Sequence, residues 1–229
     1  MTRQIPLDLR TPPALSRGDF LPADANRDAL AMLDAPARWP QGRLLLIGPE
    51  GAGKTHLASF WAAEQGARLL PAQELGGAGA PLRLLSTGAL AVDDADLIAG
   101  DPRAEAALFH LWNLAPACPA LLLMTARRPP RDWGLELPDL RSRMDATAQV
   151  RLGPPDEGLL AAVLVKLAAD RQLALPPGLV EWLARRMDRD LGLARRMVAA
   201  LDAAALASGG PVTRRMAADL LDKQVPPGA

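Results

Sequence analysis

An eight-residue glycine loop near residue 50 narrows the choice of folds more than any other segment. The run Gly48-Pro-Glu-Gly-Ala-Gly-Lys-Thr55 matches the pattern G-x-x-x-x-G-K-[ST], which a chain of this composition would contain by chance on the order of once in a thousand. The apolar run 43–47 precedes it and a helical pattern over 54–65 follows it. In this order, backbone N–H groups of the loop and the helix N-terminus can surround phosphate groups. The segment therefore predicts a nucleotide site; the alternative is a glycine-rich turn that happens to contain a lysine.

Lysine is rare in this chain, with 3 Lys against 23 Arg, and the first of the three lies inside the loop at Lys54. Its ammonium group is expected to reach the terminal phosphates of ADP or ATP, and the hydroxyl of Thr55 is expected to bind Mg²⁺. The predicted nucleotide-binding residues of this segment are Gly48, Pro49, Glu50, Gly51, Ala52, Gly53, Lys54, Thr55 and His56.

The acidic end of an apolar run supplies the second half of such a site, in Leu90-Ala-Val-Asp-Asp-Ala-Asp96. Asp93 is expected to hold Mg²⁺ directly or through water, and Asp94 to act as general base or to orient the attacking water. The alternative is an Asp pair that ends a strand in a turn. A later apolar run ends at Thr125, whose hydroxyl is expected beside the γ-phosphate, although Thr is also a common strand residue.

Charge and cysteine content exclude several other classes of protein. The 26 basic and 26 acidic side chains cancel, which argues against a protein whose main affinity comes from neutralising DNA phosphates. The single cysteine, Cys118, excludes a disulfide framework or a cysteine-based zinc site and is expected to be a buried, inert thiol.

No signal-peptide pattern is present, and no apolar run approaches the ~20 residues of a membrane span. We therefore expect a cytoplasmic protein without membrane contacts.

Strand-like and helical runs alternate from residue 43 to about residue 150, which predicts an α/β fold with a parallel sheet covered on both faces. The expected strands are 44–47, 69–70, 89–92, 120–125 and 147–152, and the expected helices are 24–34, 54–65 and 103–114. After Gly153-Pro-Pro155 only helical spacing follows, over 157–173, 178–187, 191–207 and 213–223. We predict an extended tail over 1–17, an α/β nucleotide-binding domain over 18–153 and a small helical domain over 154–229.

The order of five short motifs resembles the AAA+ ATPases of the bacterial replication-initiator clade, which comprises DnaA and short regulatory homologues of the Hda type. The motifs are Gly-Lys-Thr-His-Leu at 53–57, Val-Asp-Asp at 92–94, Ala-Arg-Arg-Pro-Pro at 126–130, Ser-Arg-Met at 142–144 and Pro-Pro-Asp-Glu at 154–157. The chain's two asparagines, Asn26 and Asn113, also coincide with family positions. The resemblance covers 18–225 and implies an AAA+ P-loop NTPase core followed by a helical lid.

The resemblance implies roles for further residues. Arg143, within Ser-Arg-Met, would be the arginine finger that enters a neighbouring subunit's ATP site; the alternative is one more surface arginine. Arg195 would be the sensor-2 arginine that contacts phosphates, with the adjacent Arg196 as the alternative. Phe20 and Leu21 would line the adenine pocket.

The two ends of the chain point to partners. Gln4-Ile-Pro-Leu-Asp-Leu9 resembles the peptides with which replication proteins dock into the bacterial sliding clamp. Gln4, Ile5, Leu7 and Leu9 would make the contacts; the alternative is an N-terminal strand or disordered filler. The sequence stops at Ala229, directly after the last predicted lid helix, where initiators continue with a DNA-binding domain.

These resemblances together imply an Hda-like negative regulator of replication initiation. Its partners would be the DnaA initiator and the DNA polymerase III sliding clamp (β), with DNA contacted only through them. Initiators of the clade often have an acidic residue where this chain has Arg127, which implies at most weak intrinsic ATPase activity. The alternatives are an autonomous AAA+ ATPase, such as a helicase loader or transposition helper, and a subunit that binds nucleotide without switching. The neighbour of the finger could also be a second copy of this chain.

Overall fold

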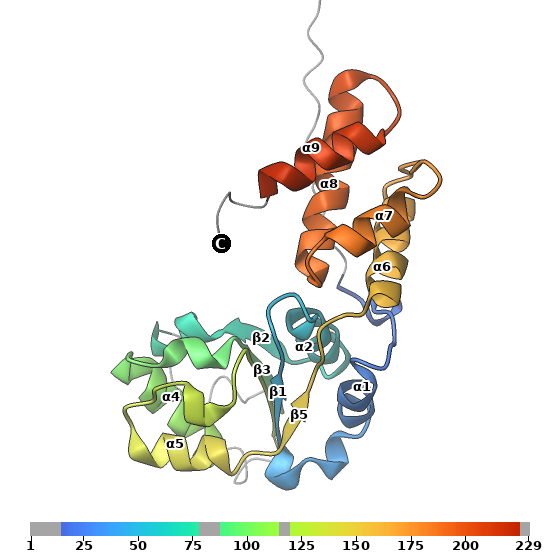
Figure 1. Ribbon diagram of the computed structural model, residues 1–229. Coiled ribbons are helices and arrows are strands. Elements are labelled where there is room, and N and C mark those ends of the chain that lie inside the picture. The colour runs from blue at the N-terminus through green and yellow to red at the C-terminus, as the bar shows by residue number, and fades with distance from the viewer. Residues whose placement is uncertain (1–14, 78–87, 115–119, 225–229) are drawn as a thin grey trace, which may run out of the picture.

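The computed structural model describes residues 15–77, 88–114 and 120–224. Within these ranges a parallel sheet lies between helices, and a group of helices follows it (Figure 1). The strands are β1 (Arg43–Ile47), β2 (Arg68–Pro71), β3 (Ala89–Asp93), β4 (Leu121–Ala126) and β5 (Gln149–Arg151), in the order β2-β3-β4-β1-β5. The helices are α1 (Arg27–Leu33), α2 (Lys54–Glu64), α4 (Pro102–Leu114), α5 (Pro138–Asp145), α6 (Glu157–Asp170), α7 (Leu179–Arg186), α8 (Leu191–Ser208) and α9 (Arg214–Gln224).

The central strand β1 is buried on both faces, which explains its uninterrupted apolar sequence. Leu44 and Leu46 pack with α1 and α2, whereas Leu45 and Ile47 pack with α4 and α5. This alternation follows from the two-residue period of a strand. The sheet is therefore sandwiched between two helix layers, and the predicted α/β fold with a parallel sheet is confirmed.

The helices α6–α9 enclose an apolar cluster of their own, centred on Leu164, Leu183, Val198 and Leu201. Figure 1 shows this group beyond the end of β1 where the glycine loop begins. Its α8 meets that loop, since the N–H of Leu191 donates to the carbonyl oxygen of Gly51 at 2.9 Å. The division of the chain into domains at residue 154 stays a prediction.

Several element boundaries differ from the sequence expectation and one helix was not expected; three of these differences have local reasons. The strand predicted over 147–152 is shorter because Thr147 lies in the turn after α5, where its hydroxyl donates to the Arg143 carbonyl oxygen at 2.9 Å. Helix α6 ends at Asp170 rather than 173, because Gln172 has a positive φ of 55°. The short α5 was missed because only Leu140 and Met144 mark its buried side. No helix in the described part of the chain has the length and apolarity of a membrane span.

Candidate nucleotide-binding site

The glycine loop joins β1 directly to α2. Gly51 and Gly53 have positive φ values of 71° and 96°, a backbone conformation that favours glycine. Gly53 is also the N-cap of α2, so the start of this helix faces the loop. The N–H of Gly48 donates to the carbonyl oxygen of Ala126 at 3.2 Å, which ties the loop to β4. These constraints bring backbone N–H groups and a helix N-terminus to one cleft, the arrangement that binds phosphate.

The Lys54 ammonium group lies in the loop, with only 6% of the residue exposed. Its Nζ donates to the carbonyl oxygens of Gly48 at 2.8 Å and Pro49 at 2.9 Å. Burial lowers the pKa of Lys54, while the charges of Asp94 and Asp93 act in the opposite direction. Because neutral carbonyl oxygens are weaker partners for a buried cation than an anion, a phosphate group would be the better ligand.

The Asp93 carboxylate, at the end of β3, links the start of α2 to β4. It accepts a hydrogen bond from Thr55 Oγ1 at 2.8 Å and another from the fully buried Thr125 Oγ1 at 2.6 Å. Hydroxyl and carboxylate oxygens are donors that Mg²⁺ prefers. The described residues hold no group of three His, Cys, Asp or Glu that could bind a metal ion alone. Thr55 and Asp93 thus fit Mg²⁺ only together with other oxygens, such as those of a nucleotide.

Asp94 lines the cleft beside Lys54 and Thr55. Its backbone has a positive φ of 52°, and its N–H donates to Thr125 Oγ1 at 2.9 Å. Burial and then the neighbouring charge of Asp93 raise the pKa of the Asp94 carboxyl group. A carboxylate with a raised pKa in a cleft is a candidate general base.

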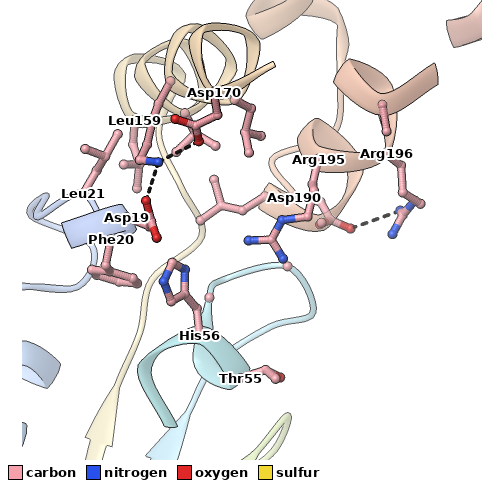
Figure 2. Close-up of a pocket in the computed structure, with 18 of the residues that line it drawn as sticks. Asp19, Phe20, Leu21, Thr55, His56, Leu159, Asp170, Asp190, Arg195 and Arg196 are labelled. Carbon is pink, nitrogen blue, oxygen red and sulfur yellow. Dashed lines mark hydrogen bonds and ion pairs between the residues drawn. The ribbon is translucent and has the colours of Figure 1, made fainter. Parts of the chain in front are cut away.

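Phe20 and Leu21 line the other side of the same cleft, as does His56. The Phe20 ring meets the edge of the His56 ring with centroids 5.3 Å apart, and meets Phe60 at 5.8 Å. Burial lowers the pKa of His56, so its ring is neutral at pH 7. This apolar and aromatic wall, visible in Figure 2, could accept a nucleobase.

Asn26 holds the segment that supplies this wall. The residue is 3% exposed, and its side chain accepts from the N–H of Ala23 at 2.9 Å and donates to the Leu21 carbonyl oxygen at 3.0 Å. Both the oxygen and the nitrogen of the side-chain amide are therefore used within the turn, which fixes Leu21 beside the cleft.

Helix α8, one of the helices α6–α9 (called the lid below), forms one wall of the cleft. Figure 2 shows Arg195 pointing from α8 toward the glycine loop, whereas Arg196 points elsewhere and approaches the Asp190 carboxylate at 3.9 Å. The Arg195 Nε is buried and has no hydrogen-bond partner among the described residues. An unpaired buried guanidinium nitrogen favours an anionic ligand, and both arginines line the cleft, so Arg195 as the phosphate contact stays a prediction.

The remaining predicted residues lie away from this cleft or beneath it. Gly48, Pro49, Ala52, Asp93 and Thr125 support the cleft without lining it. Arg143 is exposed on α5 and is not among the cleft residues; its guanidinium carbon lies 4.8 Å from the centroid of the Trp112 ring. The residues expected to bind the clamp, Gln4, Ile5, Leu7 and Leu9, lie outside the described residues, as does Cys118.

Many cleft residues had no predicted role at this site, and Asp190, Lys166 and Arg127 are three charged ones. Asp190 caps α8 by accepting from the N–H of Leu193 at 3.0 Å, and an Asp before a helical run signals only the cap. Lys166 and Arg127 also line the cleft. Lys166 gave no signal beyond the rarity of lysine. Arg127 was singled out only as a departure from the family pattern, although it directly follows a strand that ends at the site.

No protein-family model matches the chain. Among solved structures, domain III of the Thermotoga maritima replication initiation protein DnaA matches with a TM-score of 0.77 at 21% identity, covering 94% of this chain and 98% of that one. AMPPCP-bound DnaA from Aquifex aeolicus matches with a TM-score of 0.72 at 18% identity, covering 92% and 71%. The FIGL-1 AAA domain in complex with ADP matches with a TM-score of 0.69 at 15% identity, covering 91% and 84%.

The parallel sheet, the glycine loop and these likenesses define the fold as that of an AAA+ P-loop NTPase. Within that class the fold is DnaA-like, since the match to DnaA domain III extends over nearly the whole of both chains.

Proposed function

We propose that this chain binds ADP or ATP with Mg²⁺ at the glycine loop and acts in the control of replication initiation. The observation that supports binding is that Lys54 and Thr55 of α2 and Arg195 of α8 line one cleft, with Asp93 of β3 accepting a hydrogen bond from Thr55. In the proposed complex, Lys54 and Arg195 neutralise phosphate charge, and Thr55 and Asp93 hold the cation. The link to initiation is supported by the DnaA-like fold and by solved DnaA structures with AMPPCP bound.

The finer proposal is an Hda-like negative regulator that stimulates ATP hydrolysis by DnaA. Arg143 would supply the arginine finger to the initiator's ATP, because a guanidinium stabilises the charge that develops on the transferring phosphoryl group. The exposure of Arg143, and its position outside this chain's own cleft, support an action on a neighbour. Gln4, Ile5, Leu7 and Leu9 would tether the protein to the sliding clamp on DNA. The protein would act in the cytoplasm, where both partners work.

Phosphate release from ATP-loaded DnaA, in the presence of DNA-loaded clamp, tests the finer proposal. Arg143→Ala should lower the stimulation by about a thousandfold or more, the range measured for arginine fingers. Arg141→Ala is the matched control, since Arg141 is exposed on the same helix. Equal stimulation by Arg143→Ala and wild type would refute the finger. Retained clamp binding by Gln4→Ala would refute the tether.

A second candidate function is an autonomous AAA+ ATPase that loads a helicase or remodels DNA. It is favoured by Asp94, which lies in the cleft beside Asp93 and Thr125, where a hydrolytic base is needed. Rapid ATP hydrolysis by the purified chain alone, increased further by DNA, would favour this function. Slow hydrolysis that DNA does not change would favour the regulator.

A further inference from the structure

Arg127 occupies the cleft at a position fixed by its backbone. It directly follows β4, and its N–H donates to the Oδ1 atom of Asp96 at 3.2 Å. Asp96 is itself buried, with 4% of the residue exposed. The start of the Arg127 side chain is therefore held beside the ends of β3 and β4, where the candidate hydrolytic residues lie.

The Arg127 guanidinium lies between two carboxylates of this site. One nitrogen is 2.9 Å from the Glu50 carboxylate in the glycine loop, and Nε is 4.0 Å from the Asp94 carboxylate. The Asp94 side chain is 30% exposed and that of Arg127 is 42% exposed, so the pair is only partly screened by water. Arg127 also lies close enough to Lys54 that its charge adds to the effect of burial in lowering the pKa of that lysine.

We propose that Arg127 restrains hydrolysis of this chain's own nucleotide by holding Asp94 in an ion pair. The proposal rests on nucleotide binding at the glycine loop. In hydrolysis, the oxygen of water bonds to the γ-phosphorus, the bond to the bridging oxygen of ADP breaks, and a water proton passes to a base. A carboxylate held beside a guanidinium is less free to turn toward an attacking water and accept its proton. The chain would then keep bound ATP for longer.

Steady-state phosphate release by the purified full chain with Mg²⁺ and ATP tests this restraint. Arg127→Gln should raise kcat about tenfold, within the contribution of a freed general base, while KM changes little. Arg127→Lys should retain most of the restraint, since it keeps the charge. Arg128→Gln is the matched control: Arg128 is the exposed neighbour, and none of the described residues forms an ion pair with its side chain.

A double variant identifies the restrained group. Asp94→Asn combined with Arg127→Gln should remove the increase in kcat, because no base is left to be freed. The proposal is overturned if Arg127→Gln leaves kcat unchanged or lowers it, the latter being the result for an arginine that stabilises the transition state. It is equally overturned if Arg128→Gln produces the same increase, or if the increase survives in the double variant.

Separate titrations with ADP and ATP distinguish failure of the Arg127 restraint from failure of the proposed nucleotide binding. If wild type binds neither nucleotide, the proposed function and the restraint both fall. If wild type binds nucleotide and Arg127→Gln has no faster turnover, only the restraint falls. Weaker binding of ATP but not of ADP by Arg127→Gln would assign Arg127 to γ-phosphate contact and would also overturn the restraint.

Discussion

At the scale of single residues, Gly51 is the position where the contact between the glycine loop and α8 leaves no room for a side chain. Its φ is 71°, and a Cβ atom added there would lie 2.8 Å from the Cα atom of Asp190. Side-chain rotation cannot relieve a contact with backbone, so the start of α8 would have to move. The absence of a side chain at Gly51 thus allows α8 to meet the loop.

Gly51→Ala should therefore separate the lid from the loop and weaken ADP binding about tenfold or more. Gly66→Ala is the control, because Gly66 has a similar φ of 62° but no atom within 4 Å of an added Cβ. Both variants should lose about 1–2 kcal/mol of folding stability from the left-handed backbone. Isothermal titration with ADP and thermal melts measure the two effects. Equal ADP affinities of the two variants would contradict the steric account.

At the scale of elements, Lys166 of α6 connects the lid to the segment before α1. Its Nζ donates to Asp19 at 2.6 Å and to Asp170 at 2.7 Å. The hydrogen bond from Lys166, followed by one from Ser16, lowers the pKa of Asp19 to about 2. The same segment supplies Phe20 to the cleft, so this pair links the lid to the aromatic wall.

The Asp19 pair predicts a pH-dependent contribution to stability. Because its pKa is lower in the folded state than the ordinary value of 3.8, the contribution is present above about pH 4 and is lost as the pH falls toward 2. Asp19→Asn should therefore lower the free energy of unfolding by about 0.5–1 kcal/mol at pH 7, and by less at pH 3. Urea unfolding at both pH values measures the difference.

Asp24→Asn is the control for that experiment, since Asp24 is exposed and, among the described residues, pairs only with Arg27 in its own segment. It should change stability little at either pH. A difference between wild type and Asp19→Asn that stays constant from pH 7 to pH 3 would contradict the role of the Lys166 pair.

At the scale of the whole molecule, the features that were predictable from sequence are those encoded in local patterns. The glycine loop, the apolar strands and the Asp93–Asp94 pair predicted the fold, and they predicted the residues at the glycine-loop side of the cleft. Contacts between distant segments gave no such pattern: the fit of Asp190 against Gly51 and the Lys166–Asp19 pair require the folded chain. The directions in which Arg195 and Arg196 point also depend on the orientation of α8.

The buried Glu105 also makes contacts that could not be predicted from its position in the sequence. Its carboxylate accepts hydrogen bonds from the N–H groups of Gly100, Glu136 and Leu137 at 2.8–3.2 Å, and so holds the segment before α5 against α4. A helical Glu is usually exposed, so its sequence position predicts a solvated face. Only the fold shows that this residue supports the helix of Arg143.

Nucleotide binding at the glycine loop is the central claim, and equilibrium titration of the chain with ADP and Mg²⁺ tests it most directly. Wild type should bind, and Lys54→Ala should bind about tenfold to a hundredfold more weakly, because a charge-assisted hydrogen bond to phosphate is lost. Lys223→Ala, which removes an exposed lysine on α9, should bind as wild type does. No binding by wild type, or equal binding by Lys54→Ala and wild type, would contradict the claim.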